Sequence, residues 1–209
     1  LDFDGFFASV EQQAKPRLRG KPVGVVPFDT TDFTSVIACS KEAKARGVKN
    51  VMPIREAKKL CHDLILVPQS PDLYRRAHLA LINEISSVIP IEAIKSIDEL
   101  TCKLDRRDKK DPRALAQKIQ QCIGKNIGTH ITCSIGIAAN RQLAKIACKI
   151  DKPNGITIWH PKDMPAPLLP VPFDDIPGIG SRMRQRLYKA GIFTTEQLLK
   201  TDPKHMRLL

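Results

Sequence analysis

Apolar residues at helical spacing predict two amphipathic helices in the middle of the chain. The first runs from Tyr74 to Val88, with Asp72 as its N-cap, and ends before Pro90 because proline cannot continue a helix. Its apolar positions are Tyr74, Ala77, Leu81, Ile85 and Val88. The second begins at Asp111-Pro112. Its apolar face consists of Leu115, Ile119, Cys122 and Ile123.

Short apolar runs around these helices predict four strands. They are Leu1–Asp4, Ile91–Ile97, Leu100–Leu104 and Ile131–Ala138. The last run alternates apolar with small residues, as is typical of a half-buried strand. In chain order these elements are βαββαβ, the split βαβ or ferredoxin-like arrangement. The pattern therefore predicts an α+β fold whose first strand lies beside the turn at Asp98-Glu99.

The remaining segments predict an insert after the first strand of this core and a helical unit at the end of the chain. Phe6–Leu18 has the pattern of a helix that ends at Gly20, and short strands and helices follow as far as Gln69. A basic helix at Asn140–Ile150 and a strand at Gly155–Trp159 complete the core. Prolines from position 161 to 172 then predict a linker before a compact helical unit.

The charge balance narrows the class of partner. The 209 residues contain 34 Lys+Arg against 22 Asp+Glu, a net charge of +12, which favours a polyanion such as nucleic acid. A membrane surface is the competing interpretation, but no apolar run approaches the ~20 residues of a spanning helix. The six cysteines form no C-x-x-C, so we interpret them as core residues of a cytoplasmic protein. The chain opens inside a predicted strand and looks truncated there, which leaves an upstream targeting segment open.

Acidic residues at strand ends are candidates for catalysis. Asp2, the Phe3 carbonyl, Asp98 and Glu99 offer the oxygen ligands that Mg²⁺ prefers. Two such ions about 4 Å apart can stabilise the attacking and leaving oxygens of a phosphoryl transfer. Strand-end acids are also common turn residues, and we expect Asp4 to cap the next helix rather than bind metal.

Two further patterns concern nucleotides and DNA. Phe6-Phe7 opens a helix directly behind Asp2. Such aromatics are usually core residues, yet a ring at Phe7 could exclude a ribose 2′-hydroxyl by sterics. Ile176–Gly180 precedes a helix rich in arginine, which predicts a helix-hairpin-helix that grips the DNA backbone without reading sequence. Its DNA-binding candidates are Gly178, Gly180, Arg182 and Arg184.

Taken together, these motifs resemble the Y-family, or translesion, DNA polymerases (DinB/UmuC-type, ImpB/MucB/SamB). The resemblance spans nearly the whole chain in family order. It rests on Asp2–Glu11 (DFDGFFASVE), Ser40–Val48 (SKEAKARGV), Ser96–Glu99 (SIDE), Ser134–Lys145 (SIGIAANRQLAK) and Lys152–Gly155 (KPNG), together with the glycine hairpin.

The resemblance implies a right-hand polymerase. Residues 1–5 and 70–160 would form a ferredoxin-like palm, residues 6–69 small mixed α/β fingers, and residues 161–209 a partial helical thumb, with the little-finger domain absent. The implied catalytic residues are Asp2, Asp98 and Glu99, which with the Phe3 carbonyl would bind two Mg²⁺, Mn²⁺ being able to substitute. Phe6 and Phe7 would contact the nucleotide, Phe7 as a steric gate. Lys41, Lys44 and Lys152 would contact the triphosphate.

The implied function is template-directed, low-fidelity DNA synthesis in DNA repair and SOS mutagenesis. The implied partners are primer-template DNA, dNTPs and a sliding clamp bound through a segment beyond Leu209, for a monomeric, bacterial, cytoplasmic and nucleoid-associated enzyme. Lys41 and Lys44 replace the Tyr and Arg typical of DinB-type members, and this leaves the triphosphate geometry open. Three alternatives remain: an inactive DNA-binding accessory homologue, a nucleotidyl cyclase with a related palm, and a bare helix-hairpin-helix binding module.

Overall fold

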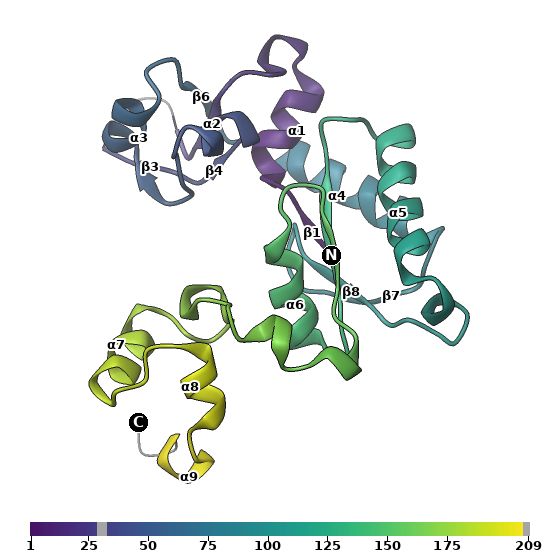
Figure 1. Cartoon of the computed structure of the whole chain (residues 1–209). Coiled ribbons are helices and arrows are strands. Elements are labelled where there is room, and N and C mark those ends of the chain that lie inside the picture. The colour runs from purple at the N-terminus through teal and green to yellow at the C-terminus, as the bar shows by residue number, and fades with distance from the viewer. Residues whose placement is uncertain (29–32, 207–209) are drawn as a thin grey trace. The chain divides into compact units, whose positions relative to one another are not determined.

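The computed structural model describes residues 1–28 and 33–206 and divides into two compact units (Figure 1). The first unit comprises residues 1–134 and 152–155, and the second comprises residues 135–151 and 156–209. The strand β9 (Cys133–Ile137) contributes its first two residues to the first unit and the rest to the second.

Six elements make up one part of the first unit. They are β1 (Asp2–Phe3), α4 (Pro71–Ser86), β7 (Ile91–Ile94), β8 (Leu100–Cys102), α5 (Pro112–Asn126) and the start of β9. β1 pairs antiparallel with β9, with Asp2 opposite Ser134, and β7 pairs antiparallel with β8. The helices α4 and α5 lie side by side (Figure 1). Both helices confirm the prediction from apolar spacing.

The segment between β1 and α4 forms two short sheets with a core of their own. Its elements are α1 (Phe6–Ala14), η1 (Pro16–Leu18), β2 (Val23–Val26), β3 (Ser35–Val36), β4 (Ala38–Cys39), α2 (Lys41–Ala45), β5 (Met52–Pro53), α3 (Ile54–Leu60) and β6 (Ile65–Pro68). The order β4-β2-β6 combines an antiparallel and a parallel pair, and β3 pairs with β5. Buried Val26, Val36 and Ile54 pack between the strands and the short helices.

Two predicted boundaries in this unit are wrong. A single helix over Phe6–Leu18 is replaced by α1 and the turn η1, because Pro16 forces the preceding Lys15 into an extended conformation. Asp72 does not cap α4: the helix starts after Ser70, with Pro71 at its first position and no side-chain cap. By contrast, Asp111 does cap α5, since its carboxylate accepts the Ala114 N–H at 2.9 Å. A short turn, η2 (Asp108–Lys110), precedes that cap.

The second unit is built on the second part of β9. β10 (Ile156–Ile158) pairs parallel with it, and α6 (Arg141–Ile150) connects the two. Buried Ile146, Trp159, Leu168 and Val171 form one core cluster, so the proline-rich segment packs into this unit. The remaining elements are η3 (Pro161–Asp163), η4 (Ala166–Leu168), η5 (Phe173–Asp175), α7 (Ser181–Lys189), α8 (Thr195–Lys200) and α9 (Pro203–Met206). The buried trio Phe173, Leu187 and Ile192 forms a second cluster under α7.

Candidate active site

The backbone of β1 brings the predicted acidic residues together. Asp2 lies opposite Ser134 on one side and forms an isolated antiparallel bridge with Glu99 on the other. Next to it, the Phe3 N–H donates to the Asp98 carbonyl at 2.8 Å. Residues almost a hundred positions apart in sequence are therefore neighbours at one edge of β1.

The charge environment of Asp2 combines a lysine with nearby acids. The Lys152 ammonium forms an ion pair with the Asp2 carboxylate and lies 3.9 Å from Oδ1 of Asp4. Burial raises the pKa of Asp2, the Lys152 charge partly offsets this, and the charges of Asp98 and Asp4 raise the pKa further. Negative charge is therefore concentrated where a cation is the natural counter-charge.

The donor set fits hard divalent cations. Asp2, Asp98 and Glu99 are half-buried carboxylates on strand ends, and such oxygens suit Mg²⁺. In residues 1–28 and 33–206 no three acidic, His or Cys side chains are already gathered as a metal site. Instead, the Ser96 hydroxyl donates to Oδ1 of Asp98 at 2.6 Å, and Lys152 holds Asp2. The ligand types are present, and their side chains are engaged by other partners.

Asp4 does not cap α1, and that prediction is wrong. The N-cap of α1 is Gly5, which makes no side-chain cap bond. The buried Asp4 carboxylate instead accepts from Ser134 Oγ at 2.8 Å, Thr132 Oγ1 at 3.0 Å and the Asn154 N–H at 2.8 Å. Through these hydrogen bonds Asp4 links β1 and β9 to the loop that contains Lys152.

A tight turn at Gly5 sets the positions of the two phenylalanines. Gly5 has φ 53°, and a Cβ there would lie 2.8 Å from the Cys39 carbonyl, so the turn needs glycine. Phe6 is buried against Phe3, with ring centroids 5.6 Å apart. Phe7 is half-buried and stacks on Tyr74 at 4.3 Å with 14° between the ring planes.

The lysines that were assigned to the triphosphate differ in their placement. Lys44 in α2 reaches back to the turn, since its ammonium lies 3.9 Å from the position of a Cβ on Gly5. Burial raises the pKa of the Cys39 thiol, and the Lys44 charge lowers it in part, as a nearby ammonium should. Lys41 is exposed at the first turn of α2, which Ser40 caps by accepting the Ala43 N–H at 3.3 Å.

The predicted DNA-binding residues all lie in the second unit. Gly178 has φ 97°, and Gly180 is the N-cap of α7 without a side-chain cap bond. Arg182 is exposed, whereas Arg184 forms an ion pair with Asp174. The element before the glycines is the single turn η5 rather than a longer helix.

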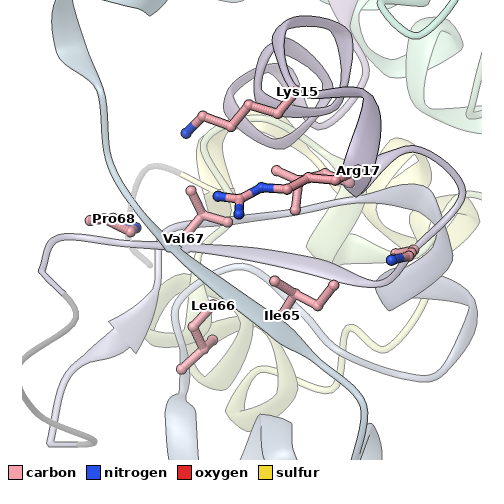
Figure 2. Close-up of a pocket in the computed structure, with 8 residues that line it drawn as sticks. Lys15, Arg17, Ile65, Leu66, Val67 and Pro68 are labelled. Atoms are coloured by element: carbon pink, nitrogen blue, oxygen red, sulfur yellow. The ribbon is translucent and has the colours of Figure 1, made fainter.

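A hollow of about 490 Å³ lies elsewhere in the first unit (Figure 2). It is lined by all four residues of β6 and by Leu18, together with three basic residues, Lys15, Arg17 and Lys21. None of the predicted catalytic or nucleotide-binding residues lines this hollow. It is therefore separate from the candidate active site.

Sequence reasoning missed several residues that support the site. His78 of α4 lies 2.8 Å from the Ile97 carbonyl, just before Asp98. Gln120 of α5 donates to the Cys133 and Asn154 carbonyls, both at 2.9 Å. Each is a polar residue on a helix that also has an apolar face. A polar residue on such a helix was the only sequence signal for these contacts.

Comparisons with known proteins identify the family. The model of the impB/mucB/samB family matches residues 1–149. DNA polymerase IV of Bacillus velezensis is 35% identical to this chain. The match covers the whole of this chain and 50% of that protein. DNA polymerase IV 1 of Bacillus subtilis is 37% identical, again over all of this chain and 50% of the relative. The chain thus spans about half the length of these relatives.

Solved structures agree with the family match. The insertion ternary complex of Dbh DNA polymerase has a TM-score of 0.84 and 32% identity, covering 98% of this chain and 60% of that one. The Y-family chimera Dbh-Dpo4(243-245)-Dbh has a TM-score of 0.85 and 32% identity over the same shares. The chain belongs to the impB/mucB/samB family, and it has the mixed α/β core fold of Y-family DNA polymerases.

Proposed function

We propose that the protein is a template-directed DNA polymerase of the translesion type. The observation that carries the proposal is the backbone bridge between Asp2 and Glu99, with Asp98 beside it. It joins two acidic strand ends, and Lys152 forms an ion pair with Asp2 there. The relatives named DNA polymerase IV and the Dbh ternary complex support the same assignment.

The proposal assigns each part of the chain a role. Residues 1–5 and 70–160 form a ferredoxin-like palm, because β1, β7, β8 and β9 alternate with α4 and α5 in the required order. Residues 6–69 form the fingers and residues 161–209 a partial thumb. The thumb would hold the DNA backbone through a helix-hairpin-helix at Gly178 and Gly180, where the first N–H groups of α7 have no side-chain cap.

In this proposal the primer 3′-hydroxyl loses its proton and attacks the α-phosphorus of the dNTP. The new O3′–P bond forms as the bond to pyrophosphate breaks. Asp2, Asp98, Glu99 and the Phe3 carbonyl would hold two Mg²⁺ or Mn²⁺ ions, which when bound stabilise charge on the attacking and leaving oxygens.

The other residues bind and orient the incoming nucleotide. Lys152 and Lys44 supply positive charge for the triphosphate, with Lys41 at the exposed start of α2. The ring of Phe7 lies under the sugar and excludes a 2′-hydroxyl. Weak contacts from small fingers would account for tolerance of damaged templates. A sliding clamp and a monomeric, nucleoid-associated state complete the proposal.

Primer extension tests the proposal and its rivals. The protein is given single dNTPs and Mg²⁺ on undamaged and abasic templates, beside the double variant Asp98→Ala, Glu99→Ala. We expect incorporation on both templates that is lost in the double variant. A protein that binds primer-template but extends no primer would support the accessory role instead, and release of a cyclic nucleotide from a triphosphate would support the cyclase.

A further inference from the structure

A buried carboxylate lies behind the proposed steric gate. Glu11, on α1 one turn beyond Phe7, is fully buried. Its Oε1 accepts the Tyr74 hydroxyl at 2.9 Å, and its Oε2 lies 2.7 Å from the Lys15 ammonium. Burying a charge is costly unless it is paired, and an apolar side chain of similar size would fill the same space without that cost. The packing of α1 alone therefore does not account for this acid.

The carboxylate holds the hydroxyl end of the Tyr74 side chain in place. Tyr74 is buried, and burial raises the pKa of its hydroxyl. Hydrogen bonding with Ser70 offsets this in part, and Glu11 raises the pKa further, so the hydroxyl stays protonated and donates. A hydrogen bond to a charged acceptor is stronger than a neutral one. Since the hydroxyl lies on the ring axis at the end opposite Cβ, the bond and the backbone of α4 hold the ring at both ends.

The fixed ring in turn supports Phe7. The two rings lie nearly parallel, 14° apart, with 4.3 Å between their centroids. Tyr74 therefore limits how far Phe7 can withdraw toward the protein core. A gate excludes a hydroxyl by sterics only while it cannot move aside, since a misplacement of ~1 Å can change a rate by roughly a hundredfold.

We propose that Glu11 is a positioning residue for sugar selection: by holding the Tyr74 hydroxyl it keeps the Phe7 ring in place against a ribose 2′-hydroxyl. The inference rests on the proposed function, because it needs a polymerase whose gate is Phe7. Glu11 itself would touch neither nucleotide nor primer. Its effect is transmitted through two aromatic rings.

The test measures kcat/KM for a dNTP and for the matching rNTP in single-nucleotide primer extension. Glu11→Ala removes the acceptor, and Tyr74→Phe removes the donor while keeping the stacked ring. We expect both to reduce the preference for the dNTP by about tenfold, through better use of the rNTP. Glu11→Gln keeps an oxygen that can accept the hydroxyl, and we expect it to restore most of the preference.

Gln12→Ala is the matched control. Gln12 is the next residue of α1, is also buried, and donates to the Leu18 and Lys21 carbonyls and to Glu42, away from Tyr74. We expect it to lower the thermal midpoint without changing sugar preference. The inference is overturned if Glu11→Ala and Tyr74→Phe keep the sugar preference of the wild type. It is also overturned if Gln12→Ala changes that preference as much as they do. Either result would leave the proposed function standing. Absence of dNTP incorporation by the wild type would overturn the proposed function, and this inference with it.

Discussion

At the scale of single residues, neighbouring phenylalanines have different environments. Phe6 packs into the core against Phe3, whereas Phe7 is half-buried on Tyr74. The sequence singles out Phe7 as the candidate gate, but it carries no signal for how differently the two rings are buried. The two rings follow the turn at Gly5, where an added Cβ would lie 2.8 Å from the Cys39 carbonyl of a distant strand.

The first prediction concerns Phe7. Phe7→Ala opens the space under the sugar, so the preference for a dNTP over its rNTP should fall roughly a hundredfold, the scale on which a pocket rejects an added hydroxyl. Single-nucleotide primer extension measures the ratio of kcat/KM values. Phe28→Ala changes an exposed ring of the same unit and serves as the control. An unchanged ratio in Phe7→Ala would exclude Phe7 as the gate.

The second prediction concerns Asp4. The Asp4 carboxylate accepts three hydrogen bonds in a buried place, from Ser134, Thr132 and Asn154. Asp4→Asn replaces one acceptor oxygen with a donor, so we expect a loss of about 1–3 kcal/mol in the free energy of unfolding. Denaturant unfolding measures it. Asp72→Asn alters an exposed carboxylate and should change stability by less than about 0.5 kcal/mol. Equal stability of Asp4→Asn and the wild type would contradict this role.

At the scale of elements, periodicity predicted the long helices well and the short segments poorly. α4 and α5 have apolar faces long enough to identify them, and Asp111 gave a usable start signal. β1 has only two residues, and its partners are distant in sequence, so no local pattern fixes its register. The contact of Lys152 with Asp2 could not be predicted from local pattern either, because the two residues are far apart in sequence.

The third prediction concerns the packing of α6 on β9. A Cβ at Gly136 would lie 2.0 Å from the Ala144 carbonyl oxygen and 2.4 Å from the Cys148 nitrogen, and backbone atoms cannot move aside cheaply. Gly136→Ala should therefore destabilise the protein by about 3 kcal/mol or more. Gly124→Ala, in α5 with nothing within 4 Å of the added carbon, should be neutral or stabilising. Thermal unfolding of both variants makes the comparison, and an equal midpoint for the two would refute this close contact.

At the scale of the whole molecule, the net charge of +12 fits a partner that carries phosphates. The part of the chain that the structure describes has no helix long and apolar enough to cross a membrane. Net charge alone does not distinguish between the basic residues that are candidates for DNA binding. Arg184 is paired with Asp174, while Arg182 on the same helix is exposed.

The fourth prediction separates these two arginines. Arg182→Ala should weaken primer-template binding and reduce the slope of log affinity against log salt by about one, as for one lost phosphate contact. Arg184→Ala should reduce the slope less, because Asp174 already neutralises that guanidinium. Binding is measured by fluorescence anisotropy over a salt series. A larger slope change for Arg184→Ala than for Arg182→Ala would contradict the assignment.

Acids on two strand ends, joined by the bridge between Asp2 and Glu99, are the groups that we propose for nucleotidyl transfer. The most direct measurement is the single-turnover rate of incorporating one correct dNTP by the wild type, Asp2→Asn and Asp98→Asn, with Asp72→Asn as control. We expect both site variants to lose roughly a thousandfold or more in rate while keeping their fold and DNA binding, and the control to match the wild type. Rates within about tenfold of the wild type in either site variant would contradict it.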